Sequence, residues 1–93
     1  MKKLNLPEVT EIANGTGTIL FITEDCEVCK KLTQELTNRV NYGYYEIIED
    51  ELIVKQLKIL SVPTLIYFEK GKPKTRLVGL FDLKSYERLD KLK

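Results

Sequence analysis

The chain has 93 residues, 43% of them hydrophobic, and its 15 basic side chains nearly balance its 14 acidic ones. This length predicts a single domain, residues 1–93, built around one small core. The net charge of +1 provides no basic surface for nucleic acid or for an anionic membrane, so we expect function to depend on a localised site.

The N-terminal segment MKKLNLPEVTEI has no apolar run after its two lysines. It therefore predicts neither a signal peptide nor a membrane span, and we expect a cytoplasmic protein. Within this segment, Asn5, Pro7 and Glu8 are typical of a helix start, with an Asx cap, a proline in the first turn and an acid three residues after the cap. The expected helix is short and ends by Asn14 to Gly17.

An uninterrupted apolar run, Thr18 to Thr23 (TILFIT), predicts a strand that is buried on both faces. Apolar residues then recur every four positions, which predicts an amphipathic helix ending near Asn41 to Gly43. The residues expected to face inward are Val28, Leu32, Leu36 and Val40.

Next come a second expected strand, Tyr44 to Ile48, and a short helical segment, Glu51 to Leu60. The inward positions of that helix are expected to be Leu52, Ile53, Leu57 and Leu60. Tyr42, Tyr44 and Tyr45 are interpreted as strand packing and edge residues, because the low net charge argues against stacking on nucleic acid.

Two further strands, Leu65 to Phe68 and Lys74 to Gly79, are separated by EKGKP, which predicts an antiparallel hairpin with Gly71 in its turn. Asp82 is the expected cap of a closing helix. Its apolar stripe is Leu83, Tyr86, Leu89 and Leu92. The predicted order αβαβαββα indicates an α/β domain with a four-stranded mixed sheet flanked by helices.

The only two cysteines, Cys26 and Cys29, lie just after the buried strand, at the start of the amphipathic helix. Residues three apart at a helix start can approach as closely as a disulfide requires, so both dithiol and disulfide are compatible with this backbone. The free N–H groups of the helix start favour the thiolate of the first cysteine. A lasting structural disulfide is uncommon in the cytoplasm.

Three motifs together resemble the thioredoxin family: CEVC after TILFIT, SVPTLIYFEKGKP, and RLVG before the final helix. The resemblance covers roughly Thr18 to Leu92 and implies a thioredoxin-like fold. It implies that Cys26 attacks the substrate disulfide as nucleophile and that Cys29 is the resolving thiol.

The resemblance also bears on three positions outside the cysteine pair. Composition alone predicts a trans Val62–Pro63 bond, because cis bonds before proline are uncommon, whereas the family implies a cis bond beside the cysteines. Val62 is then expected to pair with an extended substrate segment, and Gly79, with the segment to Phe81, to lie near the cysteines and contact a partner. For Gly79 itself, a bend or close backbone approach is the interpretation that we favour from the residue type alone.

The chain departs from the family pattern around the cysteines. It has no tryptophan, and Asp25 precedes Cys26. The family's buried aspartate, which takes the proton of the second cysteine, falls at Leu20. Glu24, water or the partner protein remain as proton acceptors, or else resolution is slow.

Other uses of the cysteines fit the sequence less well than a redox one. A structural zinc site needs about four ligands, and two cysteines without any histidine supply too few. A glutaredoxin-like glutathione-dependent enzyme or cluster carrier is the alternative, although the usual Cys-Pro-Tyr-Cys and paired glycines are missing. A redox-inert binding module with the same fold is another.

We predict a thiol-disulfide oxidoreductase that reduces or exchanges protein disulfides, with no bound cofactor or metal. Its expected partners are disulfide-containing proteins and an upstream reductase or low-molecular-weight thiol. It is expected to be a monomer that binds neither nucleic acid nor membrane.

Overall fold

The structure is a computed structural model that describes residues 1–48, 50–79 and 83–90. Its elements are α1 (Leu6–Ala13), β1 (Gly17–Ile22), α2 (Glu27–Leu36), β2 (Gly43–Glu46), α3 (Leu52–Gln56), β3 (Thr64–Glu69), β4 (Lys72–Val78) and α4 (Leu83–Asp90). This order confirms the predicted αβαβαββα arrangement, and strand bounds differ from the predicted ones by one or two residues.

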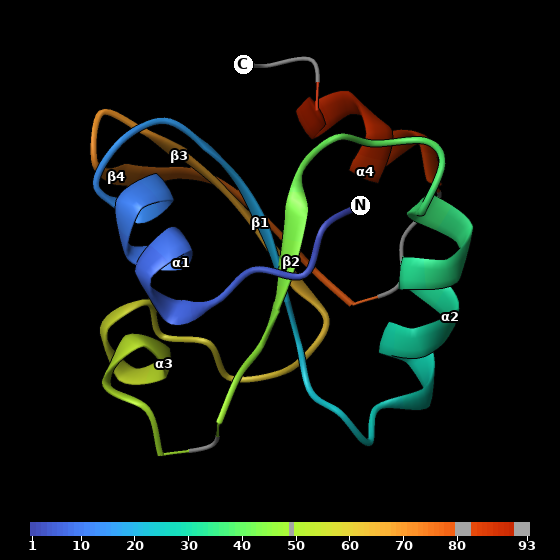
Figure 1. Ribbon diagram of the computed structural model, residues 1–93, viewed down its shortest axis with the longest axis horizontal. Coiled ribbons are helices and arrows are strands. Elements are labelled where there is room, and N and C mark those ends of the chain that lie inside the picture. Colours follow the sequence, from blue (N-terminus) through green and yellow to red (C-terminus); the bar gives the residue numbers. More distant parts are fainter. Residues whose placement is uncertain (49, 80–82, 91–93) are drawn as a thin grey trace.

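The four strands form one mixed sheet in the order β2-β1-β3-β4. β1 runs parallel to β2 and antiparallel to β3, and β3 and β4 form the predicted antiparallel hairpin with Gly71 at φ +79°. Figure 1 shows α1 and α3 together on one side of the sheet and α2 and α4 on the other. The sheet is therefore covered on both faces, as a strand of unbroken apolar residues requires.

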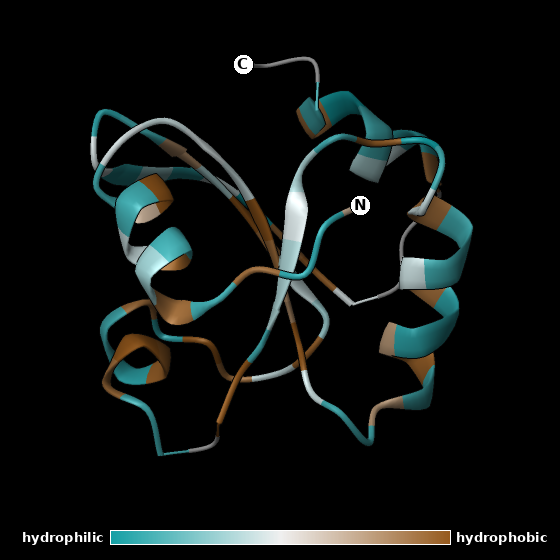
Figure 2. Ribbon diagram, in the orientation of Figure 1, coloured by the Kyte–Doolittle hydropathy of each residue, from teal (hydrophilic) through white to brown (hydrophobic). Residues whose placement is uncertain are grey.

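All six residues of β1 are buried, and its four large apolar side chains alternate between two apolar clusters. Leu20 and Ile22 pack in the cluster that includes α2 and α4, while Ile19 and Phe21 pack in the cluster that includes α1. Residues of β3 divide in the same way. Figure 2 shows the resulting hydrophobic band along β1 and β3 in the middle of the molecule.

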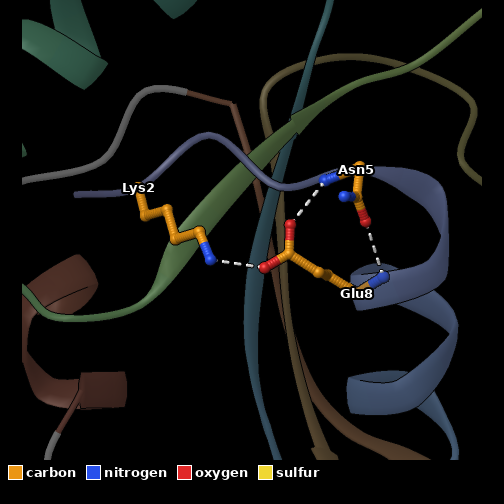
Figure 3. A network of polar contacts seen from close by, with 3 residues as sticks. All are labelled: Lys2, Asn5 and Glu8. Carbon is orange, nitrogen blue, oxygen red and sulfur yellow. Dashed lines mark hydrogen bonds and ion pairs between the residues drawn. The ribbon is translucent and has the colours of Figure 1, made fainter.

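The start of α1 is held by the predicted cap, shown in Figure 3. The Glu8 N–H donates to Asn5 Oδ1 at 2.9 Å, and the Asn5 N–H donates to Glu8 Oε1 at 3.0 Å. Lys2 Nζ lies 2.5 Å from Glu8 Oε2. The hydrogen bond from Lys2, followed by that from the Asn5 backbone, lowers the pKa of Glu8, so this network stabilises the fold above the usual carboxyl pKa and is lost as the pH falls.

The segment before α1 adds a short parallel bridge to β2, which the sequence analysis did not predict. The Leu4 N–H donates to the Tyr44 carbonyl at 2.7 Å, and the Tyr44 N–H donates to the Lys2 carbonyl at 2.9 Å. Gly43 permits this approach, because a Cβ there would lie 2.6 Å from Cγ of Leu4.

Of the residues expected to face inward on α2, Leu32 and Leu36 are buried as predicted, but Val28 and the expected end of the helix are wrong. Val28 is 43% exposed, whereas Cys29, Leu32 and Leu36 are fully buried. The helix spans Glu27–Leu36, and its inward stripe follows positions 29, 32 and 36, a helical spacing of three and then four. It ends at Leu36, and Val40 is buried beyond the helix.

The expected inward face of α3 is also partly wrong. Ile53 and Leu57 pack against the apolar cluster that includes α1, as predicted, but Leu52 is 68% exposed and Leu60 is 94% exposed. The helix is only five residues long, and the left-handed backbone of Lys58 (φ 54°) redirects the chain after it.

The tyrosines of the β2 region pack as predicted. Tyr45 lies in the same cluster as Ile47, and Tyr44 packs against the opposite one, where Tyr42 is buried. On α4, the expected inward residues Leu83, Tyr86 and Leu89 contact the cluster that includes α2. The expected cap Asp82 and the last stripe residue Leu92 lie outside the described residues.

Replacing Asn5 by Ala should lower the free energy of unfolding by about 1 kcal/mol, because the first N–H groups of α1 lose their cap. Urea denaturation measures this loss. Asn38→Ala, at an exposed position after α2, is the matched control. Equal stability of the two variants would contradict the capping role.

Candidate active site

The first turn of α2 is capped by sulfur. Cys26 precedes the helix with extended backbone (φ −91°, ψ 108°), and its Sγ accepts the Cys29 N–H at 3.1 Å. The Lys30 N–H donates to the Cys26 carbonyl at 3.1 Å, and the Cys26 N–H donates to the Thr23 carbonyl at 3.4 Å. The sulfur thus lies where N–H groups of the helix start are free to stabilise negative charge.

Cys26 and Cys29 form a disulfide with their Cα atoms 5.2 Å apart. This separation is usual for a disulfide. The geometry confirms that the two residues can be joined at the helix start, as their spacing predicts.

The two cysteines differ in burial. Cys26 is half-buried and packs at the edge of the cluster that includes α2, whereas Cys29 is fully buried within it. A reagent in solution can therefore reach Cys26 first. Leu20, at the position where the family has its aspartate, is fully buried in the same cluster. Leu20 therefore places an apolar side chain, and no carboxylate that could accept a proton, at this position of β1.

Pro63 follows a cis peptide bond with Val62, as the resemblance implies. The Gly79 N–H donates to the Pro63 carbonyl at 2.9 Å, so the end of β4 is held against the start of β3. Val62 packs against both apolar clusters, one of which also contacts Cys26. Within the described residues, neither the N–H nor the carbonyl of Val62 takes part in a hydrogen bond.

Gly79 has φ +89°, in the region that favours glycine. Among the described residues, a Cβ at this position would meet nothing within 4 Å. The positive φ at the bend therefore accounts for the glycine, and a close approach of other described backbone does not. Residues 80 and 81, expected to continue the contact surface, lie outside the described residues.

Side-chain hydrogen bonds that sequence reasoning missed hold the bend at Gly79 and the end of α3. The hydroxyl of the buried Tyr86 donates to the Gly79 carbonyl. Arg76 on β4 donates to the Leu57 carbonyl at 2.6 Å and to the Lys58 carbonyl at 3.1 Å, which satisfies the end of α3. The sequence indicates Tyr86 only as an apolar position, and it contains no local signal for the partner of Arg76.

Exposed charged residues lie next to the cysteine pair in the chain. Glu27 and Lys30, one turn apart on α2, form an ion pair at 3.7 Å. Glu24 and Asp25 are exposed, and neither forms an ion pair within the described residues. An acidic edge therefore lies directly before Cys26.

Comparison with known proteins gives the family. No protein-family model matches the chain. The chain is 38% identical over 84 residues to the thioredoxin of Chlamydia caviae, a match that covers 84% of this chain and 82% of that protein. The chain belongs to the thioredoxin family.

Solved thioredoxins share the fold at lower sequence identity. A mutant thioredoxin from Halobacterium salinarum superposes with a TM-score of 0.73 over 98% of this chain and 89% of its own, at 19% identity. The oxidised thioredoxin from Plasmodium falciparum superposes with a TM-score of 0.70 over 99% of this chain and 97% of its own, at 21% identity. These likenesses confirm the predicted thioredoxin-like fold.

A thioredoxin-family chain that joins Cys26 and Cys29 of a Cys-x-x-Cys motif is a thiol-disulfide oxidoreductase, as predicted. Proteins of this family act on disulfide substrates and are recycled by reductases. Across residues 1–48, 50–79 and 83–90, no helix is long and apolar enough to cross a membrane.

In the reduced protein, iodoacetamide should modify Cys26 well before Cys29, because only Cys26 is partly exposed and stabilised as a thiolate by the helix start. Mass mapping of the alkylated peptides over time measures the order. Modification of both cysteines at the same rate in the folded protein would contradict this arrangement.

Proposed function

We propose that the chain, folded as one domain, reduces or exchanges disulfides of other proteins with Cys26 as nucleophile and Cys29 as resolving thiol. The observation that carries this assignment is the position of Cys26, a partly exposed residue whose Sγ accepts the N–H of Cys29 at the helix start. The burial of Cys29 supports its role as the resolving thiol. A buried thiol is protected from disulfides in solution, but it lies next to Cys26.

The reaction consists of two exchanges. The Cys26 thiolate attacks one sulfur of the substrate disulfide, a new disulfide joins protein and substrate, and the other substrate sulfur leaves as a thiolate that takes a proton. Cys29 then loses its proton and attacks the Cys26 sulfur, which releases the second substrate thiolate. The protein ends as the Cys26–Cys29 disulfide and the substrate has gained two electrons and two protons. An upstream reductase or low-molecular-weight thiol returns the two electrons.

Val62, Pro63 and Gly79 form the proposed substrate-binding backbone. The N–H and carbonyl of Val62, which bond to no other described residue, support pairing with an extended substrate segment, in the manner of an added strand. The hydrogen bond from Gly79 to the Pro63 carbonyl supports a common surface for both loops.

The proposed setting is the cytoplasm, where the protein acts as a monomer, without a bound cofactor or metal and without nucleic acid or membrane as partner. The balanced charge of the chain supports this setting, since it offers no basic surface for a polyanion. The partners are then disulfide-bearing proteins and the electron donor.

Leu20 makes the second exchange the demanding one. Cys29 must lose a proton in a cluster that it shares with the apolar side chains of Leu20, Leu32 and Leu65, where burial disfavours the thiolate. We propose that the proton leaves through water, Glu24 or the partner, and that the mixed disulfide lives longer than it would with a carboxylate at position 20.

Cys29→Ser should accumulate a covalent complex with substrate, because Cys26 still attacks but nothing releases the product. Non-reducing electrophoresis with a disulfide-bearing protein such as insulin measures the complex. Cys26→Ser is the matched variant and should trap none. Equal trapping by both variants would mean that the roles are wrongly assigned.

Leu20→Asp should speed release of the mixed disulfide relative to Leu20→Asn, since only the carboxylate can accept the Cys29 proton. A well-placed general base increases a reaction rate about 10²-fold or more. We therefore expect the aspartate variant to release the mixed disulfide clearly faster than the asparagine variant at neutral pH. Both variants should lose about 3 kcal/mol of stability, because each places a polar group in an apolar cluster.

Stopped-flow release of the second thiol from a preformed mixed disulfide measures this step in the folded fraction. Equal release rates for the aspartate and asparagine variants would show that proton removal from Cys29 does not limit the reaction.

A further inference from the structure

A groove of about 420 Å³ lies between the end of β2 and the segment that leads into β3. Its lining includes Thr23, Ile47, Ile59 and Val62. Two of these residues connect it to the cysteine site: the Thr23 carbonyl accepts the Cys26 N–H, and Val62 precedes the cis bond to Pro63. The volume falls within the range of about 300 to 1,000 Å³ that binding sites usually have.

The edge of this groove carries an apolar side chain that the fold leaves in solvent. Leu60 lines the groove and is 94% exposed. A second hollow shares Thr23 and Ile47 with the groove, and Ile48, which lines it, is 66% exposed. Figure 2 shows hydrophobic segments at the end of β2 and before β3 at the lower edge of the view. Single exposed leucines are ordinary, but two large apolar side chains at adjoining hollows indicate a contact surface.

The second hollow is also lined by charged side chains. Glu24 and Asp25 line it together with Lys30, whose ammonium is held by Glu27. Glu24 and Asp25 remain without an ion pair among the described side chains. These acidic groups favour a basic side chain on whatever binds here.

We propose that this surface, defined by Leu60, Ile48, Glu24 and Asp25, selects substrate proteins in which an apolar and a basic residue flank the target cysteine. The proposal rests on the proposed function, because the substrate segment must lie along Val62 while its sulfur reaches Cys26. Leu60 contacts the apolar side chain, and Glu24 with Asp25 contacts the basic one. These residues act as specificity determinants outside the cysteine pair.

A set of synthetic peptides tests the selection, each with one cysteine joined to thionitrobenzoate by a disulfide. Leucine or alanine on one side of the cysteine is combined with arginine or glutamate on the other, and each combination is made in both orders. The Cys26 thiolate attacks the peptide sulfur, the thionitrobenzoate anion leaves with the electron pair of the broken bond, and its absorbance gives the second-order rate constant.

The leucine-arginine peptide should react fastest with the unmodified protein. Leu60→Ser should lower the leucine-to-alanine rate ratio about 10-fold, as expected for loss of an apolar contact. Leu6→Ser, at an exposed position on α1 away from the groove, is the matched control and should leave the ratio unchanged. An unchanged ratio in Leu60→Ser would overturn the apolar part of the proposal.

The double variant Glu24→Gln with Asp25→Asn should bring the arginine-to-glutamate rate ratio close to one. The ratio cancels any change in the reactivity of Cys26 itself, because both peptides meet the same thiolate. Added salt should also bring the arginine-to-glutamate rate ratio of the unmodified protein closer to one, because it screens the acidic groups. A ratio near one in the unmodified protein at low salt would overturn the acidic part.

Two controls separate this proposal from the proposed function. If the reduced protein releases no thionitrobenzoate even from the small disulfide dithiobis-nitrobenzoate, the oxidoreductase function itself fails. If that reaction proceeds but all peptides react alike, only the selection fails. Sedimentation is the last check: a dimer that Leu60→Ser abolishes, with peptide ratios near one, would make the groove a contact between two copies and overturn the proposal.

Discussion

The hydrogen bond from the Cys29 N–H to Cys26 Sγ is the contact on which the site depends. Every helix start has N–H groups without partners inside the helix, and an oxygen of Asn, Asp, Ser or Thr usually accepts one of them. In α2 a sulfur takes that place. The Sγ of Cys26 therefore both caps the helix and acts as the attacking atom. The N–H groups at the helix start stabilise the negative charge of its thiolate.

The surrounding fold keeps this turn in position during the reaction. β1 is buried on both faces and ends four residues before Cys26, while Cys29, Leu32 and Leu36 attach α2 to the sheet. On the other side, Gly79 is bonded to the Pro63 carbonyl and to the Tyr86 hydroxyl. The bond between the half-buried Cys26 and the buried Cys29 can therefore form or break without rearrangement of the sheet.

Features set by neighbouring residues could be predicted from the sequence, and features set by distant ones could not. The Asn5 cap, the hairpin and the cysteine pair at a helix start are local, whereas the cis bond at Pro63 followed only from family resemblance. Helical spacing from Leu32 fits both Val28 and Cys29, so the sequence did not decide which of the two is buried. Leu60 is exposed because the chain turns at Lys58, and its apolar character alone predicted the opposite.

The central claim is that the Cys26–Cys29 bond opens and closes while the fold stays the same. Equilibration in buffers of oxidised and reduced dithiothreitol, with alkylation to count thiols and far-UV circular dichroism on the same samples, tests it most directly. We expect a single two-electron transition, reached from either direction, with an unchanged circular dichroism spectrum. Cysteines that never join under oxidant, or a spectrum that loses helix on reduction, would contradict it.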